Sequence, residues 1–152
     1  MVFWRSIRCA AQNGIIVRRV RREACMSYWD GIKTLKEWFG PDMRSVSKEQ
    51  AQGRAYVCIF GNNGKGCPNN HLGGWSLPEA AADFIKSCAE KKLQLRLSVS
   101  LEENLGTCTK CKCRLSLKVH VPFKHIYNHT SDEQFAEFPD FCWLTKERKA
   151  RS

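Results

Sequence analysis

The stretch CTKCKC, residues 108–113, is the part of the chain that decides our interpretation of the fold. Three thiols fall within six residues, in the order C-x-x-C-x-C. A C-x-x-C turn presents two thiolates to one metal ion, and zinc in structural sites takes four such ligands in a tetrahedral arrangement. The stretch therefore predicts half of a structural zinc site, with Cys108 and Cys111 as its ligands.

The other half of the site has to come from elsewhere in the chain. Cys58 and Cys67 flank a turn rich in glycine and asparagine, which can bring the two thiols together. We therefore expect zinc to be held by Cys58, Cys67, Cys108 and Cys111. Cys113 and Cys142 compete for the same places, and free buried thiols remain an alternative. A second, weaker alternative is a metal site formed by the histidines, because two of them, four residues apart, would share a helix face; the three candidates are His120, His125 and His129.

Composition limits the classes of partner and compartment. The chain has 152 residues, a formal net charge of +10 and a pI of about 9.3, which favours polyanionic partners, nucleic acid first. Nine cysteines is an odd number, and no apolar signal segment follows Met1. A disulfide framework of a secreted protein is therefore not expected, and clustered thiols in a reducing cytoplasm favour a metal. We also expect no membrane contact, because no long apolar run is present.

The patterning predicts an α+β fold for a single domain. Residues 1–24 form a basic arm, residues 25–143 the domain, and residues 144–152 a basic tail. Apolar spacing predicts a helix over 25–39, and capping boxes at Ser47 and Ser76 predict helices over 48–57 and up to residue 92. Residues 93–98 and 114–121 alternate and predict two strands. The expected fold is a small zinc-stabilised domain, with a β-hairpin zinc knuckle packed on two or three helices, between the arm and the tail.

The cysteine motifs, with the LKVHVP segment over 117–122 and the Cys142-Trp143 pair, resemble those of small cysteine-rich proteins of tailed phages and prophages. The resemblance spans roughly residues 35–143. Those proteins tend to carry C-x-x-C-P first and C-x-x-C-G-C second. Here the first pair is stretched to eight intervening residues, and Lys112 stands in place of the glycine. The resemblance implies a viral origin, with the protein in the host bacterial cytoplasm or the virion, and a metal site, but no activity.

The function expected from these observations is a non-enzymatic, zinc-binding phage protein that contacts nucleic acid. No paired-carboxylate motif, phosphate loop or H-E-x-x-H motif points to an enzyme. Cations of the arm and of the polar side of the second predicted strand would contact phosphates; they are Arg18, Arg19, Arg21, Arg22, Arg114 and Lys118. The alternatives are a structural or assembly protein that binds another viral protein, and a free inhibitor of a host protein.

Overall fold

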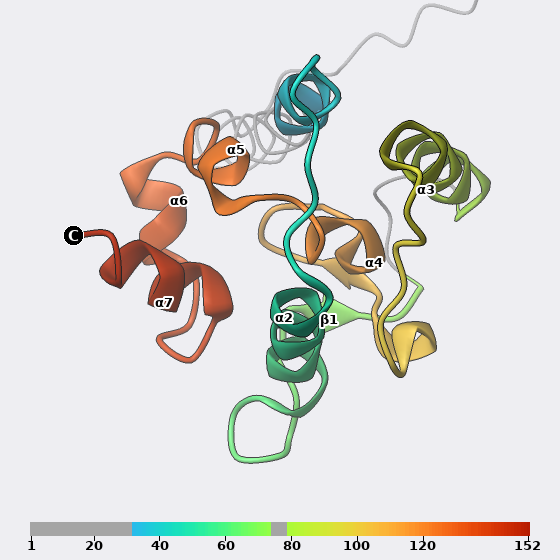
Figure 1. The fold of residues 1–152 in the computed structure, drawn as a ribbon. Coiled ribbons are helices and arrows are strands. Elements are labelled where there is room, and N and C mark those ends of the chain that lie inside the picture. The colour runs from blue at the N-terminus through green and yellow to red at the C-terminus, as the bar shows by residue number, and fades with distance from the viewer. Residues whose placement is uncertain (1–31, 74–78) are drawn as a thin grey trace, which may run out of the picture.

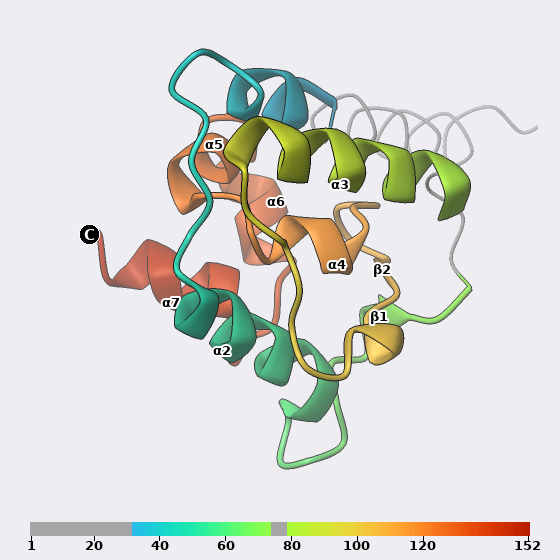
Figure 2. The ribbon, with the colours of Figure 1, turned by 45° about the vertical axis from the view of Figure 1, so that its right-hand side comes forward.

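The computed structural model describes residues 32–73 and 79–152. Within these ranges the fold is α+β and mostly helical, with one two-stranded antiparallel sheet (Figure 1). A helical segment over residues 32–38 comes first. The elements after it are α2 (Lys48–Phe60), β1 (Asn70–His71), α3 (Glu79–Leu93), the 3-10 helix η1 (Glu102–Asn104), β2 (Thr107–Cys108), α4 (Leu115–Lys118), α5 (Phe123–Tyr127), α6 (Asp132–Ala136) and α7 (Trp143–Lys149). Short α4 lies at the centre, with α2, α3 and the C-terminal helices around it (Figures 1 and 2).

The predicted helices are present where the structure describes them. Ser47 caps α2, because its hydroxyl accepts a hydrogen bond from the backbone N–H of Gln50 at 3.1 Å. The helix continues to Phe60, three residues beyond the predicted end, and α3 ends at Leu93. The basic arm, the first part of the predicted 25–39 helix and the cap at Ser76 lie outside the described residues.

The predicted β-hairpin is wrong at its second strand, because residues 115–118 form α4. Backbone hydrogen bonds from Lys118 N–H to the Arg114 carbonyl (3.0 Å) and from Val119 N–H to the Leu115 carbonyl (3.1 Å) close helical turns. The apolar residues of the segment are buried as expected, but Lys118 and His120 between them are buried too. Since residues 117–121 are all buried, the alternation does not separate a core face from a solvent face there.

The first predicted strand is also wrong. Gln94 takes a left-handed conformation (φ 52°) at the end of α3, and the N–H of Leu95 donates back to the Glu90 carbonyl at 3.2 Å. Glycine is the usual residue at a helix end of this kind. Because glutamine stands here instead, the sequence carries no clear signal that the helix stops. Beyond it the N–H of Leu97 donates to the Glu90 carboxylate at 2.8 Å instead of to a neighbouring strand.

The strands recorded in the described ranges join the two cysteine-bearing segments. β1 and β2 are antiparallel, with Asn70 opposite Cys108 and His71 opposite Thr107. Gly106 makes this approach possible, because a Cβ there would lie 2.0 Å from the His71 carbonyl oxygen. The Asn70 amide strengthens the junction: its Oδ1 accepts from Gly106 N–H (2.8 Å), and its Nδ2 donates to the Asn104 carbonyl (2.9 Å).

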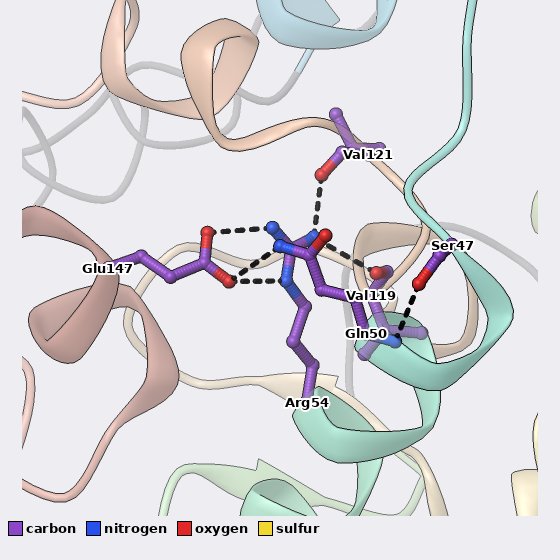
Figure 3. A network of polar contacts seen from close by, with 6 residues as sticks. All are labelled: Ser47, Gln50, Arg54, Val119, Val121 and Glu147. Carbon is purple, nitrogen blue, oxygen red and sulfur yellow. Dashed lines mark hydrogen bonds and ion pairs between the residues drawn. The ribbon is translucent and has the colours of Figure 1, made fainter. Parts of the chain in front are cut away.

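Arg54 of α2 connects three parts of the core, as Figure 3 shows. Its side chain is 2% exposed and forms a bidentate ion pair with Glu147 of α7, both N–O distances being 2.7 Å. Nη1 donates to the carbonyls of Val119 (3.0 Å) and Val121 (2.7 Å), just after α4. The guanidinium carbon lies 4.3 Å from the centre of the Trp143 ring. A single side chain therefore supplies hydrogen bonds to the end of α4 and holds α7 against α2.

Helix α7 contains most of the segment predicted as a basic tail. The predicted boundary falls at Trp143, the first residue of the helix. Trp143 and Leu144 are buried in the core, while Lys146 and Lys149 are exposed. Lys149 pairs with Asp140 at 3.2 Å.

We expect Arg54→Met to lower the free energy of unfolding by about 3 kcal/mol, because two buried carbonyls lose their Arg54 donor and Glu147 loses its bidentate partner. Urea denaturation followed by circular dichroism measures this change. Lys48→Met, at an exposed position of the same helix, serves as the control. Equal losses in the two variants would contradict the role assigned to Arg54.

We also expect stability to depend on His120 below neutral pH. Its Nε2 is buried and has no hydrogen-bond partner among the described residues. Burial, followed by the charges of Lys86 and Arg54, lowers the pKa of His120 to about 4. The unfolded chain takes up this proton near pH 6.5, whereas the folded chain does so only near pH 4. Stability should therefore fall as the pH drops between these values, by at most about 1.4 kcal/mol per pH unit.

Unfolding free energies at several pH values between 7 and 4.5 measure this dependence. His120→Leu should flatten it, and His71→Gln, at an exposed position, should leave it unchanged. An equal slope in wild type and His120→Leu would remove His120 as its source.

Candidate metal centre

The first cysteine-bearing turn follows α2. Cys58 lies in the last turn of the helix, and residues 61–66 loop away and return. The N–H of Cys67 then donates to the Cys58 carbonyl at 3.0 Å. Gly66 has φ 78°, and a Cβ there would lie 2.8 Å from the Ile59 carbonyl oxygen, so a larger residue would strain the return. The prediction that this turn brings Cys58 and Cys67 together is confirmed at the backbone level.

The second turn is the CTKCKC stretch itself. The chain reverses tightly there, with hydrogen bonds from Cys108 N–H to the Cys113 carbonyl (3.0 Å) and from Lys112 N–H to the Cys108 carbonyl (2.8 Å). Thr109 N–H donates to the Asn69 carbonyl at 2.8 Å, which fixes this turn beside the first. Lys112 holds a left-handed conformation with φ 55°. Glycine adopts this conformation without a steric penalty, whereas a residue with a Cβ does not.

Four thiols line one small pocket between the two turns and α7. Cys58, Cys67 and Cys108 are three of the predicted ligands, and Cys142 is the fourth thiol of the pocket. The predicted ligand Cys111 does not line it. Across residues 32–73 and 79–152, no three His, Cys, Asp or Glu side chains are already arranged around one point as a bound metal requires. The pocket thus gathers the thiols without placing them in a closed tetrahedron.

Lys118 is a buried cation at the same place. Its side chain lines the pocket, and its Nζ lies 2.8 Å from Cys111 Sγ. The ring centres of Phe138 and Trp143 lie 5.5 and 5.9 Å from the ammonium nitrogen. A buried ammonium needs an anion nearby, because burial alone strongly disfavours its charge. Burial opposes the charge of Lys118, but the thiolates, Cys111 foremost, outweigh this effect and raise its pKa.

The thiols divide into neutral and anionic groups. Burial raises the pKa of Cys58 to about 12, with further contributions from the charges of Cys142 and Cys67, and burial also raises the pKa of Cys142. Cys111 differs: hydrogen bonds from Cys108 and Cys113, and then Lys118, hold its pKa well below the usual range. These neighbours therefore favour the ionised form of Cys111 beside Lys118.

The predicted nucleic-acid residues have different positions. Lys118 is 6% exposed, and a buried lysine cannot contact phosphate, so it does not belong to such a surface. Arg114 is partly exposed and follows the cysteine turn. The four arginines of the arm, over residues 18–22, lie outside the described residues.

Two of the three candidate histidines form a separate cluster around one carboxylate, and His120 is not part of it. Glu37 accepts from His125 Nδ1 at 2.9 Å and faces His129 Nε2 at 2.7 Å, while Asn128 Nδ2 donates to it at 2.9 Å. The hydrogen bond with His125 is the main reason that the pKa of Glu37 is lowered. One ring nitrogen of His125 and one of His129 are therefore engaged with Glu37, which lies far from them in the sequence.

Comparisons with known proteins do not assign a function to this site. Scans against protein-family models and searches of curated proteins and of solved structures found no match. Among the described residues, no helix has the length and apolarity to span a membrane. The function of the site is therefore inferred from its own geometry.

Sequence reasoning missed the position of Lys118. Alternation placed Lys118 on a solvent face, and only the helical turn of α4 directs it towards the thiols. Two signals could have indicated this: leucine and lysine favour helix over strand, and Lys118 stands between the apolar residues Leu117 and Val119.

We expect Lys112→Gly to raise the free energy of unfolding by roughly 1 kcal/mol, because glycine relieves the left-handed strain. Lys110→Gly, in the same turn but without a positive φ, should lower it by about 0.5–1 kcal/mol. Chemical denaturation of both variants measures the difference. Two variants shifted in the same direction would contradict the strain assigned to Lys112.

Proposed function

We propose that this chain is a non-enzymatic zinc-binding module that contacts nucleic acid, with the metal held by thiols between the two cysteine turns. The observation that carries the proposal is a buried lysine whose close polar partner is a cysteine sulfur: Lys118 Nζ and Cys111 Sγ are 2.8 Å apart beside a pocket lined by four more cysteines. Core stability does not explain this cluster of thiols beside a buried lysine, since well-packed hydrophobic residues would stabilise a core better.

Zinc accounts for both features together. Four thiolates around one Zn²⁺ leave a net charge of about −2, by the ordinary charges of these groups. The ammonium of Lys118 lowers that excess, and its three N–H donors can bond to sulfur. A closed four-thiolate site leaves no position for a substrate, which favours a structural role for the metal over a catalytic one.

The second cysteine turn, residues 108–113, also carries cations that can contact a partner. Lys110 and Lys112 alternate with the thiols of the turn and lie on its exposed or half-exposed side, followed by Arg114. Lysine and arginine side chains gain affinity from phosphates without reading the base sequence. A metal that fastens the turn would hold these cations in a fixed arrangement. The excess of positive charge over the whole chain, +10, acts in the same direction.

A protein partner is the second candidate, favoured by one feature of α2. Tyr56 and Phe60 are 48% and 45% exposed, one helical turn apart, with ring centres at 5.5 Å. Exposed aromatic pairs of this kind are common at protein interfaces. The resemblance of the cysteine motifs to phage proteins supports a viral structural protein as this partner, in the host cytoplasm or the virion.

The test combines metal content with salt-dependent binding. We expect one zinc per purified chain by elemental analysis, and binding of labelled DNA or RNA that weakens linearly in log–log form as salt rises. Lys110→Gln with Lys112→Gln should reduce the salt slope by up to about 1.8, since each phosphate contact contributes about 0.9.

Lys48→Gln with Lys91→Gln, both exposed and away from both cysteine turns in sequence, is the matched control. Absence of binding at low salt would remove the nucleic-acid function and leave the protein partner. A purified chain that contains no zinc but has the circular dichroism of a folded protein would contradict the proposed zinc binding.

A further inference from the structure

We infer that the fourth metal ligand is Cys142, so that zinc is held by Cys58, Cys67, Cys108 and Cys142, and that Cys111 serves as the hydrogen-bond partner of Lys118 instead. This assignment rests on the proposed zinc module and specifies its ligands. It differs from the ligand set predicted from the cysteine spacing, in which both thiols of the C-x-x-C pair bind one ion.

The lining of the pocket is the first argument. The pocket is bounded by the thiols of these four residues, with Lys118 and the aromatic residues Phe138 and Trp143 beside them. Cys111 and Cys113 are not part of its lining. The thiols come from three separate segments of the chain, as expected for a site that connects elements rather than closing one local loop.

The backbone provides the second argument. The N–H of Cys67 donates to the Cys58 carbonyl at 3.0 Å, so these two cysteines belong to one turn. Cys108 joins them through the β1–β2 register, which places it opposite Asn70, three residues after Cys67.

The backbone fixes Cys142 at the site. Its N–H donates to the Pro139 carbonyl at 2.9 Å, and the two residues after it, Trp143 and Leu144, are buried. Cys142 is the N-cap residue of α7, so the start of this helix fixes its position beside the pocket.

The thiols outside the pocket have other bonds. Cys111 Sγ lies 2.8 Å from Lys118 Nζ, and Cys113 Sγ donates to the Cys111 carbonyl at 3.3 Å. Lys118 lines the pocket and its Nζ contacts Cys111 Sγ, so this residue connects Cys111 to the pocket. On metal binding the four thiols release their protons to solvent and Lys118 can donate to a metal thiolate.

Three single serine variants test the assignment on the full chain: Cys142→Ser, Cys111→Ser and Cys113→Ser. Serine is a favoured N-cap residue, so Cys142→Ser should preserve or strengthen the start of α7 while it removes the thiol. We expect Cys142→Ser to lose zinc affinity by on the order of 100-fold or more, beyond the loss typical of a supporting residue. Cys111→Ser and Cys113→Ser should retain one zinc per chain.

Cobalt substitution provides a second measurement. The sulfur-to-cobalt charge-transfer absorption grows with the number of bound thiolates, so wild type, Cys111→Ser and Cys113→Ser should have equal intensity and Cys142→Ser a lower one. Circular dichroism of each variant reports whether the fold is kept.

The outcomes separate the assignment from the proposed function. Zinc retained in Cys142→Ser with full cobalt intensity, or zinc lost in Cys111→Ser, would overturn the assignment and leave the zinc module in place. A wild-type chain that binds neither zinc nor cobalt would overturn both.

Discussion

The buried carbonyls that follow α4 impose the main constraint on this fold. Val119 and Val121 have carbonyl oxygens deep in the core, and Arg54 donates to both of them. An unsatisfied buried carbonyl would cost a large part of the stability of a small domain. The same guanidinium pairs with Glu147, so α2 and α7 are held to the centre through one residue. The position of α7 in turn places Cys142 beside the other thiols.

Features with a local cause could be predicted from the sequence. Ser47 has the side chain that a helix start requires, and the glycine-rich turn returns Cys67 to Cys58 because few other sequences can turn so tightly. The C-x-x-C-x-C stretch also predicts the tight reversal that is found. These features depend on a few consecutive residues, so the sequence carries their signal directly.

Features that depend on distant contacts could not be predicted. The alternation over 114–121 is typical of a strand at a surface, but residues 117–121 are all buried, and pattern alone does not reveal such burial. The pairing of Glu37 with His125 and His129 joins positions about ninety residues apart, which no spacing rule connects. Cys142 could be named as a competitor for the metal, yet only the packing of α7 brings it to the pocket.

The origin of the pocket thiols has a consequence for how the chain folds. Cys58 and Cys142 are separated by more than half of the 152 residues, so the pocket is built from contacts of high sequence separation. Such contacts are slow to form, because a long loop must close before they become favourable. During synthesis the thiols of the two turns emerge well before α7, and the last wall of the pocket forms only when the C-terminal helix docks. Completion of the pocket therefore marks the end of folding rather than its beginning.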